Sequence, residues 1–291
     1  MPIVYAILSG ILYGTLGFFG TRLEERGLHI SEFLALRFTI ASLLVAALMI
    51  VRRIPFNFNR DAMKLMAISA LFYATSTELY FIACHSLGTG VSMVLFFCYP
   101  VTVILLMWGI DRLSPSLSTT LALSSMLIGL PFLVDLSEFN ASFVGLVIGV
   151  AAAALYGTYF YLSKRYVKKL SILPSVFWVC TGSSLSSFLT LFSEEVFTWE
   201  MTSGVVVDAF LLALVSTVLP LLFVFKAFEK LESSQASLLS VCEPVVTLLL
   251  GFAFLGEKIS WIQGMGVLLV LMSVALIRYQ KKETIQNQQL E

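Results

Sequence analysis

Charged residues are scarce in this chain. Asp, Glu, Lys and Arg make up 12% of its 291 residues, and their formal charges cancel to zero, whereas roughly a quarter of the residues in a soluble domain are charged. Hydrophobic residues instead make up 58% of the chain. So little charge excludes a soluble globular protein, and the lack of a basic excess excludes a nucleic-acid-binding one. The composition is that of a protein that crosses a membrane many times.

Histidine and cysteine are also few. The two histidines, His29 and His85, have no metal-ligand partner nearby in the sequence, and the four cysteines lie in apolar runs without CxxC or Cys/His spacing. The sequence contains no phosphate-binding GxxxxGK[ST] loop. It therefore predicts no metal site, no cofactor, no enzymatic activity and no direct use of ATP.

Long apolar runs fill most of the sequence. A helix needs about 20 mostly apolar residues to span a bilayer, and ten runs reach or approach that length. They lie at Pro2–Thr21, Ser31–Val51, Ala62–His85, Thr89–Trp108, Pro115–Asp135, Ser142–Ser163, Ile172–Phe192, Val205–Phe228, Ser233–Phe254 and Ser260–Tyr279. The sequence therefore predicts an all-α membrane protein with ten transmembrane helices, whose short connections leave no room for a soluble domain.

The basic residues are distributed unevenly between the two sets of loops. Of the 18 lysines and arginines, 14 lie on the side of the two termini, and Arg37 lies inside a helix. Only Arg22, Arg26 and Lys258 lie on the other side. Because basic loops face the cytoplasm, we predict that both termini are cytoplasmic.

Two segments of the first half recur in the second half. Leu-Tyr-Gly-Thr at 12–15 recurs at 155–158, an offset of 143 residues, and Cys-x-Pro-Val at 98–101 recurs at 242–245, an offset of 144. This pattern indicates a duplication.

The duplication divides the chain into two repeats of five helices, at 1–140 and 141–280, followed by a polar cytoplasmic tail at 281–291. Because five is an odd number, the second repeat would enter the membrane in the opposite orientation to the first. Inverted repeats are typical of transporters that bind substrate near the midplane between the halves and work by alternating access.

The same motifs resemble a known group of transporters. Residues 13–15, Leu-Arg-Phe at 36–38, Cys-Glu-Pro at 242–244 and Leu-Gly-Glu-Lys at 255–258 are similar to motifs of the drug/metabolite transporter superfamily, and the last two to its EamA-type domain. The resemblance covers nearly the whole chain as two such domains. It implies a ten-helix transporter of the bacterial inner membrane with a central cavity.

The first half departs from the family pattern. Tyr99 stands where the family has Glu, and Asp-Arg-Leu at 111–113 replaces Leu-Gly-Glu. Only the second half therefore keeps the acid before the proline.

That acid is the first candidate binding residue. Glu243 would lie near the membrane midplane, where an acidic residue is costly and usually functional or paired. At 3.6 residues per turn it shares a face with Ser240, and the equivalent face of the fourth helix carries Phe96 and Tyr99. We predict that these faces bind a ligand with a positive amine and an apolar part. The alternative is that Glu243 only braces a broken helix.

Prolines and tyrosines add further candidates. Pro100 and Pro244 remove backbone hydrogen bonds from the fourth and ninth helices, so each marks either a plain kink or a gating hinge. Tyr13 and Tyr156, which are repeat equivalents, and Tyr80 in the third helix are expected to line the cavity.

Arg37 and Glu78 are expected at matching depth in adjacent helices. Each lies roughly 10–12 Å below the outer surface at 1.5 Å per residue, so a salt bridge between them is the simplest interpretation. Alternatively, Arg37 binds a substrate carboxylate, or Glu78 takes part in proton coupling together with His85, seven residues further on the same face.

These features predict a secondary transporter of a small organic metabolite, an amino acid or a related amine, and the family resemblance favours export. A broad exporter of cationic, aromatic drugs is the alternative within transport. A membrane protein that handles lipid headgroups is the alternative from another class, but it would need nucleophiles, bases or metal ligands clustered at an interface. The expected partners are the substrate, the lipid bilayer and, if Glu78 couples transport, protons; no nucleic acid is expected.

Overall fold

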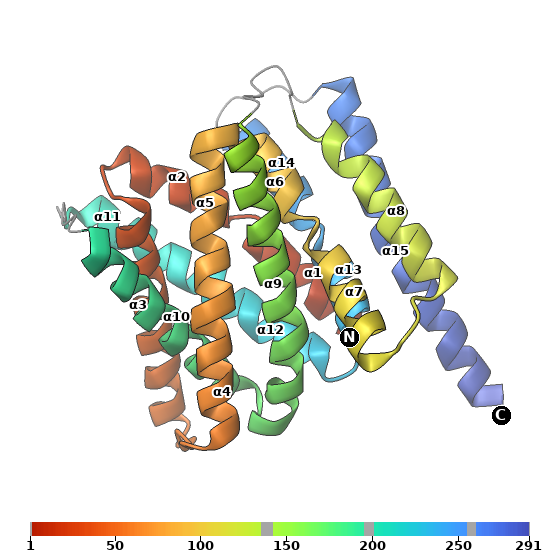
Figure 1. Ribbon diagram of the computed structural model, residues 1–291. Helices are drawn as coiled ribbons and strands as arrows, with labels where there is room; N and C mark the ends of the chain where they lie inside the picture. Colours follow the sequence, from red (N-terminus) through yellow and green to blue (C-terminus); the bar gives the residue numbers. More distant parts are fainter. Residues whose placement is uncertain (1, 135–141, 195–200, 255–259, 291) are drawn as a thin grey trace.

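The computed structural model describes residues 2–134, 142–194, 201–254 and 260–290, and every regular element in them is helical (Figure 1). Nine helical units in this part of the chain are long and apolar enough to span a membrane. A tenth, α8 (Leu117–Phe132), is apolar but only 16 residues long. The prediction of an all-α protein with ten membrane helices is therefore confirmed.

The first half contains five spans, of which three are interrupted. In chain order the spans are α1 (Pro2–Tyr13) with α2 (Leu16–Glu25); α3 (Ile30–Val51); α4 (Arg60–Ile68), η1 (Ser69–Ala74) and α5 (Thr75–Leu87); α6 (Thr89–Phe96) with α7 (Tyr99–Asp111); and α8.

The second half again contains five spans. They are α9 (Phe143–Leu170); α10 (Ile172–Glu194); α11 (Ser203–Ala213), η3 (Leu214–Val218) and α12 (Leu219–Phe228); α13 (Ser233–Ser240) with α14 (Glu243–Phe254); and α15 (Trp261–Leu290). The polar tail predicted from residue 281 continues α15 as a helix to Leu290. The Leu-Gly-Glu-Lys motif at 255–258, which resembles the family motif, lies outside the described residues.

Irregular turns recur at the repeat offset. The third span of each half contains a π-helical turn, η1 in the first half and η3 in the second, and adding 144 to the bounds of η1 gives 213–218. The fourth span of each half is broken just before its proline, at Phe97–Cys98 and at Val241–Cys242. These matched interruptions support the duplication predicted from the motifs.

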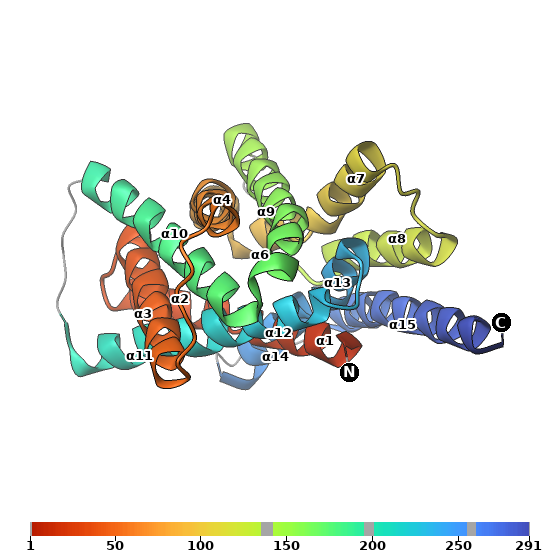
Figure 2. The same ribbon diagram turned by 90° about the horizontal axis from the view of Figure 1, so that it is seen from below.

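The two halves interlock in pairs. The third span of one half packs against the first span of the other, as α5 against α9 and α12 against α1, while α3 packs against α10. Figures 1 and 2 show α8 and α15 side by side at one edge of the bundle. If each span is replaced by its equivalent in the other half, the same helix contacts result, as expected for a duplicated chain. The inverted orientation of the second repeat remains a prediction.

One cluster of charges was not predicted. Arg22 and Arg26, which the sequence assigned to an outer loop, lie in the last turn and at the C-cap of α2. Their Nε atoms donate to Oδ2 of Asp208 in α11, at 3.2 and 2.9 Å, and Asp208 is buried. These bonds join the ends of two spans from different halves.

Candidate functional site

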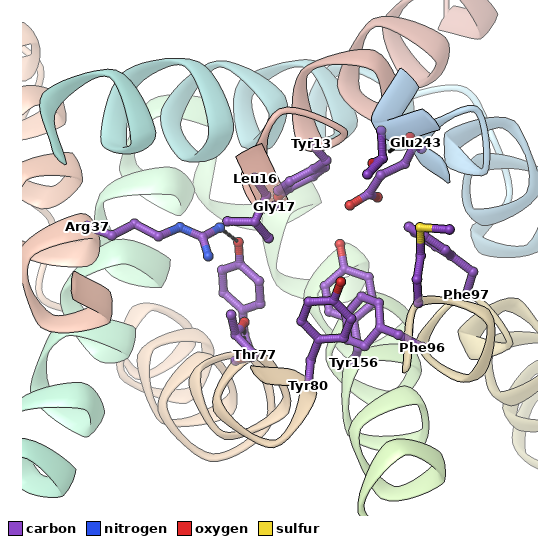
Figure 3. Close-up of a pocket in the computed structure, with 13 residues that line it drawn as sticks. Tyr13, Leu16, Gly17, Arg37, Thr77, Tyr80, Phe96, Phe97, Tyr156 and Glu243 are labelled. Carbon is purple, nitrogen blue, oxygen red and sulfur yellow. Dashed lines mark hydrogen bonds between the residues drawn. The ribbon is translucent and has the colours of Figure 1, made fainter. Parts of the chain in front are cut away.

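A cavity lies among the interrupted spans and is lined from both halves (Figure 3). It encloses about 530 Å³ of space between atoms, its open mouth included, as narrow gaps rather than one wide chamber. The lining residues are Tyr13, Leu16, Gly17, Arg37, Tyr73, Thr77, Tyr80, Met93, Phe96, Phe97, Tyr156, Glu243 and Thr247.

The lining residues indicate on which side the cavity opens. Leu16, Tyr80, Met93 and Thr247 lie on the segments that lead to the end of α2, the end of α5, the start of α6 and the end of α14. These helix ends lie toward the upper side of Figure 1. Because these four residues are partly exposed, whereas Tyr13, Arg37 and Glu243 are buried, we infer that the cavity opens toward that side of the bundle.

Aromatic side chains close the opposite side. The Tyr99 hydroxyl donates to the Ser237 carbonyl at 3.1 Å, which joins α7 to α13. The Tyr99 ring lies 5.7 Å from that of Phe160, and Phe160 lies 4.9 Å from Phe228, between ring centroids. All four residues are buried, so this side is sealed.

Glu243 occupies the first position of α14, directly after the break in the ninth span. Its proline neighbour, Pro244, stands in the first turn, where a missing backbone N–H leaves no helix bond unmade. A carboxylate at a helix N-terminus is favoured by the unpaired N–H groups there. Glu243 is 8% exposed and lines the cavity. Both prolines therefore begin the second part of a broken span, and a role as gating hinges remains a prediction.

Glycines in the other half hold the two breaks in place. A Cβ added at Gly14 would lie 2.8 Å from the carbonyl oxygen of Glu243, and one added at Gly157 would lie 2.7 Å from that of Tyr99. Only glycine allows the backbones to approach so closely. Thr247 Oγ1 also donates to the Gly14 carbonyl at 3.1 Å. The repeated Tyr-Gly-Thr motif thus contacts the repeated break.

Aromatic rings form one wall of the cavity. The ring of Phe96 lies 4.9 Å from Tyr80 and 5.0 Å from Tyr156, between centroids. Tyr13 lies on α1 and also lines the space. Figure 3 shows Tyr80, Phe96 and Tyr156 gathered on the side opposite Tyr13. The rings could contact an apolar or cationic group in the cavity.

Arg37 also lines the cavity, and its predicted pairing with Glu78 is wrong. Its guanidinium donates to Thr217 Oγ1 at 2.6 Å, to the Tyr73 hydroxyl at 3.0 Å and to the Ser216 carbonyl at 3.3 Å. Glu78 instead accepts a hydrogen bond from Thr190 Oγ1 of α10 at 3.3 Å. Equal depth in the sequence does not determine which neighbouring helix each side chain meets.

Three other residues that the sequence suggested for the site do not line the cavity. Ser240 donates to the Ala6 and Ala236 carbonyls at 3.4 and 3.0 Å and packs against Gly10, so it is a packing residue. Tyr99 belongs to the sealed side. His85 Nε2 lies 3.4 Å from Glu24 Oε1 near the end of α5 and is 67% exposed. A proton path through Glu78 and His85 remains a prediction.

Several lining residues had not been predicted. Tyr73 stacks on Tyr159 at 4.6 Å, between centroids, beside the cavity. Gly17 also lines the cavity, and a Cβ added there would have no atom within 4 Å. Thr77, Met93 and Phe97 also line the space. In the sequence these residues look like ordinary members of apolar helices, and only the partner helices distinguish them.

Comparisons with known proteins agree with this fold and place the chain in a family. Its residues 1–134 and 143–279 match the EamA-like transporter family. An uncharacterized inner membrane transporter of Salmonella typhimurium, YicL, is 24% identical over 286 residues, 93% of each chain. An uncharacterized transporter of Archaeoglobus fulgidus is 26% identical over 273 residues, again 93% of each chain. A solved crystal structure, 15% identical, has the same fold, with a TM-score of 0.83 over 97% of this chain and 98% of that one. The chain belongs to the EamA-like transporter family and is a membrane transporter.

Proposed function

We propose that the protein is a secondary transporter that moves a small organic amine, an amino acid or a related compound, across the bacterial inner membrane with both termini in the cytoplasm. The observation that carries this proposal is Glu243, a buried acid at a helix break that faces a cavity walled by aromatic rings. A carboxylate and ring faces together suit an ammonium group attached to an apolar body. Export is the direction that the family resemblance favours.

Alternating access is the mechanism that we propose. The cavity is open toward one side and closed by Tyr99, Phe160 and Phe228 on the other. Matched breaks in the two halves would let an arrangement with the opposite side open form from the same contacts. Glu243 and the aromatic wall would then be accessible from each side of the membrane in turn, so that an amine bound from one side could leave on the other.

Counterflow in proteoliposomes tests the proposal. Vesicles containing the purified protein and an unlabelled amino acid or monoamine are mixed with the same radiolabelled compound, over a panel of the twenty amino acids and their decarboxylated amines. We expect saturable accumulation of at least one compound. We expect Glu243→Gln to lower its initial rate at least tenfold, because the substitution weakens the hydrogen bond to the ammonium group, and a hydrogen bond to a charged group is worth about 1.5–3 kcal/mol.

The control is Glu229→Gln, because Glu229 is an exposed acid paired with Lys226 away from the cavity. It should transport like the wild type. Accumulation of no amine or amino acid, or an unchanged rate in Glu243→Gln, would rule out the proposal. Displacement by many unrelated lipophilic cations would instead favour a drug exporter.

A further inference from the structure

Arg37 faces Glu243 from the opposite wall of the cavity. Figure 3 shows the two side chains directed into the cavity from opposite sides, and both line it. Arg37 has no exposed surface. A buried guanidinium and a buried carboxyl group thus border the same space without touching, since none of the salt bridges among the described residues joins them.

The guanidinium is held by neutral groups from two π-helical turns. Tyr73 belongs to η1, and Ser216 and Thr217 belong to η3. Tyr73 and Thr217 are separated by 144 residues, the offset of the repeat. π-Helical turns are rare and occur frequently at functional sites. Equivalent irregular turns of the two halves therefore fix the position of one arginine.

The charge of Arg37 lacks a full set of partners. Its Nη1 is buried and has no hydrogen-bond partner among the described residues. A buried charge is costly unless it is paired and hydrogen-bonded. The acceptors that Arg37 does have are a phenol, a hydroxyl and a carbonyl, none of which carries a full negative charge. An anionic group in the cavity would supply what is missing.

The arginine and the acid each occur in only one half. At the repeat offset of 143 to 144 residues Arg37 corresponds to Cys180 or Thr181, and Glu243 corresponds to Tyr99. A pair of charges needed only to hold two equivalent halves together would have equivalents in both. This asymmetry gives the cavity a basic wall and an acidic wall, and hence a polarity that a ligand must match.

We infer that the substrate is a zwitterion, with its carboxylate on Arg37 and its ammonium group on Glu243. The inference rests on the proposed function and narrows it from amines in general to amino acids. Arginine presents parallel N–H donors that suit a carboxylate. The apolar side chain of the amino acid would lie against Tyr80, Phe96 and Met93, which line the same space. A plain amine would leave Arg37 uncompensated, and a plain acid would meet Glu243.

Binding to the purified wild type tests the inference without any substitution. Each of the twenty amino acids is compared with its decarboxylated amine and its deaminated acid, as in L-phenylalanine, phenethylamine and 3-phenylpropionate, by isothermal titration. We expect at least one amino acid to bind about tenfold or more tightly than either relative, the ratio that one charged hydrogen-bonded contact supplies. If no amino acid binds more tightly than its amine, the inference is wrong.

Variants of the arginine then locate the carboxylate. We expect Arg37→Gln to weaken the amino acid at least tenfold and to change the amine less than twofold. Arg37→Lys should weaken the amino acid less than Arg37→Gln, because the charge is kept. Arg22→Gln serves as the control, since Arg22 pairs with Asp208 outside the cavity. If Arg37→Gln does not fold, the wild-type panel and Arg37→Lys decide.

The two proposals fail in different ways. Two results would overturn the zwitterionic substrate but leave the proposed amine transporter standing. One is binding of amines as tight as that of amino acids; the other is an equal loss of affinity for amine and amino acid in a folded Arg37→Gln. Binding and transport of neither amines nor amino acids would overturn the proposed function.

Discussion

At the scale of single residues, one glycine leaves room in the cavity wall. Gly17 lies four residues after Tyr13, and Phe160 lies four residues after Tyr156, so the two are repeat equivalents at the offset of 143. Phe160 helps to seal one side, whereas Gly17 has nothing within 4 Å of the position of a Cβ. At this pair of equivalent positions, the open side has a hydrogen where the closed side has a benzyl group.

Filling that space should block transport. We expect Gly17→Phe to reduce the counterflow rate at least tenfold, because the new ring would occupy the cavity next to Tyr13 and Arg37. Its thermal stability in detergent should stay close to that of the wild type, since a side chain there has room.

Gly109→Phe is the matched control for this substitution. Gly109 is an exposed glycine of α7 that also has nothing within 4 Å of the position of a Cβ. Its replacement by phenylalanine should leave transport intact. Wild-type transport by Gly17→Phe would show that substrate takes another route.

At the scale of helices, the interruptions perform different tasks. The breaks before Pro100 and Pro244 start new helices at Tyr99 and Glu243, and the first turn of a helix tolerates proline. The π-helical turns η1 and η3 instead bring their side chains to Arg37. The break before a proline and the π-helical turn each occur once in each half, at the repeat offset, whereas the break between α1 and α2 has no equivalent in α9.

The two contacts between a glycine and a helix break should contribute equally to the stability of the protein. We expect Gly14→Ala and Gly157→Ala each to lower the free energy of unfolding by about 1–3 kcal/mol, the usual cost of overpacking. In both, the new methyl group would overlap a backbone carbonyl, which cannot move aside as a flexible side chain can. Unfolding in sodium dodecyl sulphate measures the change.

Gly109→Ala is the control for this pair, because its methyl group would meet no neighbour. It should be neutral or slightly stabilising, since alanine favours a helix over glycine. A loss in only one of Gly14→Ala and Gly157→Ala would contradict the equivalence of the two breaks.

At the scale of the whole molecule, each half packs helices against those of the other half. The third span of each half packs on the first span of the other, so neither half encloses the cavity alone. Glu243 comes from the second half and Arg37 from the first, and the aromatic wall contains residues of both. A shift of one half against the other would therefore change both walls at once.

Accessibility to thiol reagents should reveal the open side. In a chain with Cys84, Cys98, Cys180 and Cys242 replaced by alanine, we expect Thr247→Cys to react with a membrane-impermeant maleimide added from the outer face. Thr247 lines the cavity on the open side of the break.

Ser237→Cys is the matched position in the same span and should be protected. Ser237 is fully buried, and its carbonyl accepts the Tyr99 hydrogen bond on the sealed side. Labelling of Thr247→Cys only from the cytoplasmic face would contradict the predicted orientation. Equally rapid labelling of Ser237→Cys would contradict the seal.

Composition, apolar run lengths and short repeated motifs were sufficient to predict the class, the ten helices and their family. These are properties of residues close together in the chain, and lipid imposes them strongly because a spanning segment must be apolar and helical. Glu243, Tyr13, Tyr80, Phe96 and Tyr156, which the sequence suggested as binding residues, all line the cavity, and their role in binding remains a prediction.

The tertiary structure decided which distant side chains meet. In the structure Arg37 contacts Tyr73 and Thr217 rather than Glu78. Ser240 and Tyr99 do not line the cavity. Rotation of a helix about its axis by one residue turns a different face to its neighbours, about 100° away at 3.6 residues per turn. Packing of complete helices fixes that rotation, and with it the charges that face each other across the cavity.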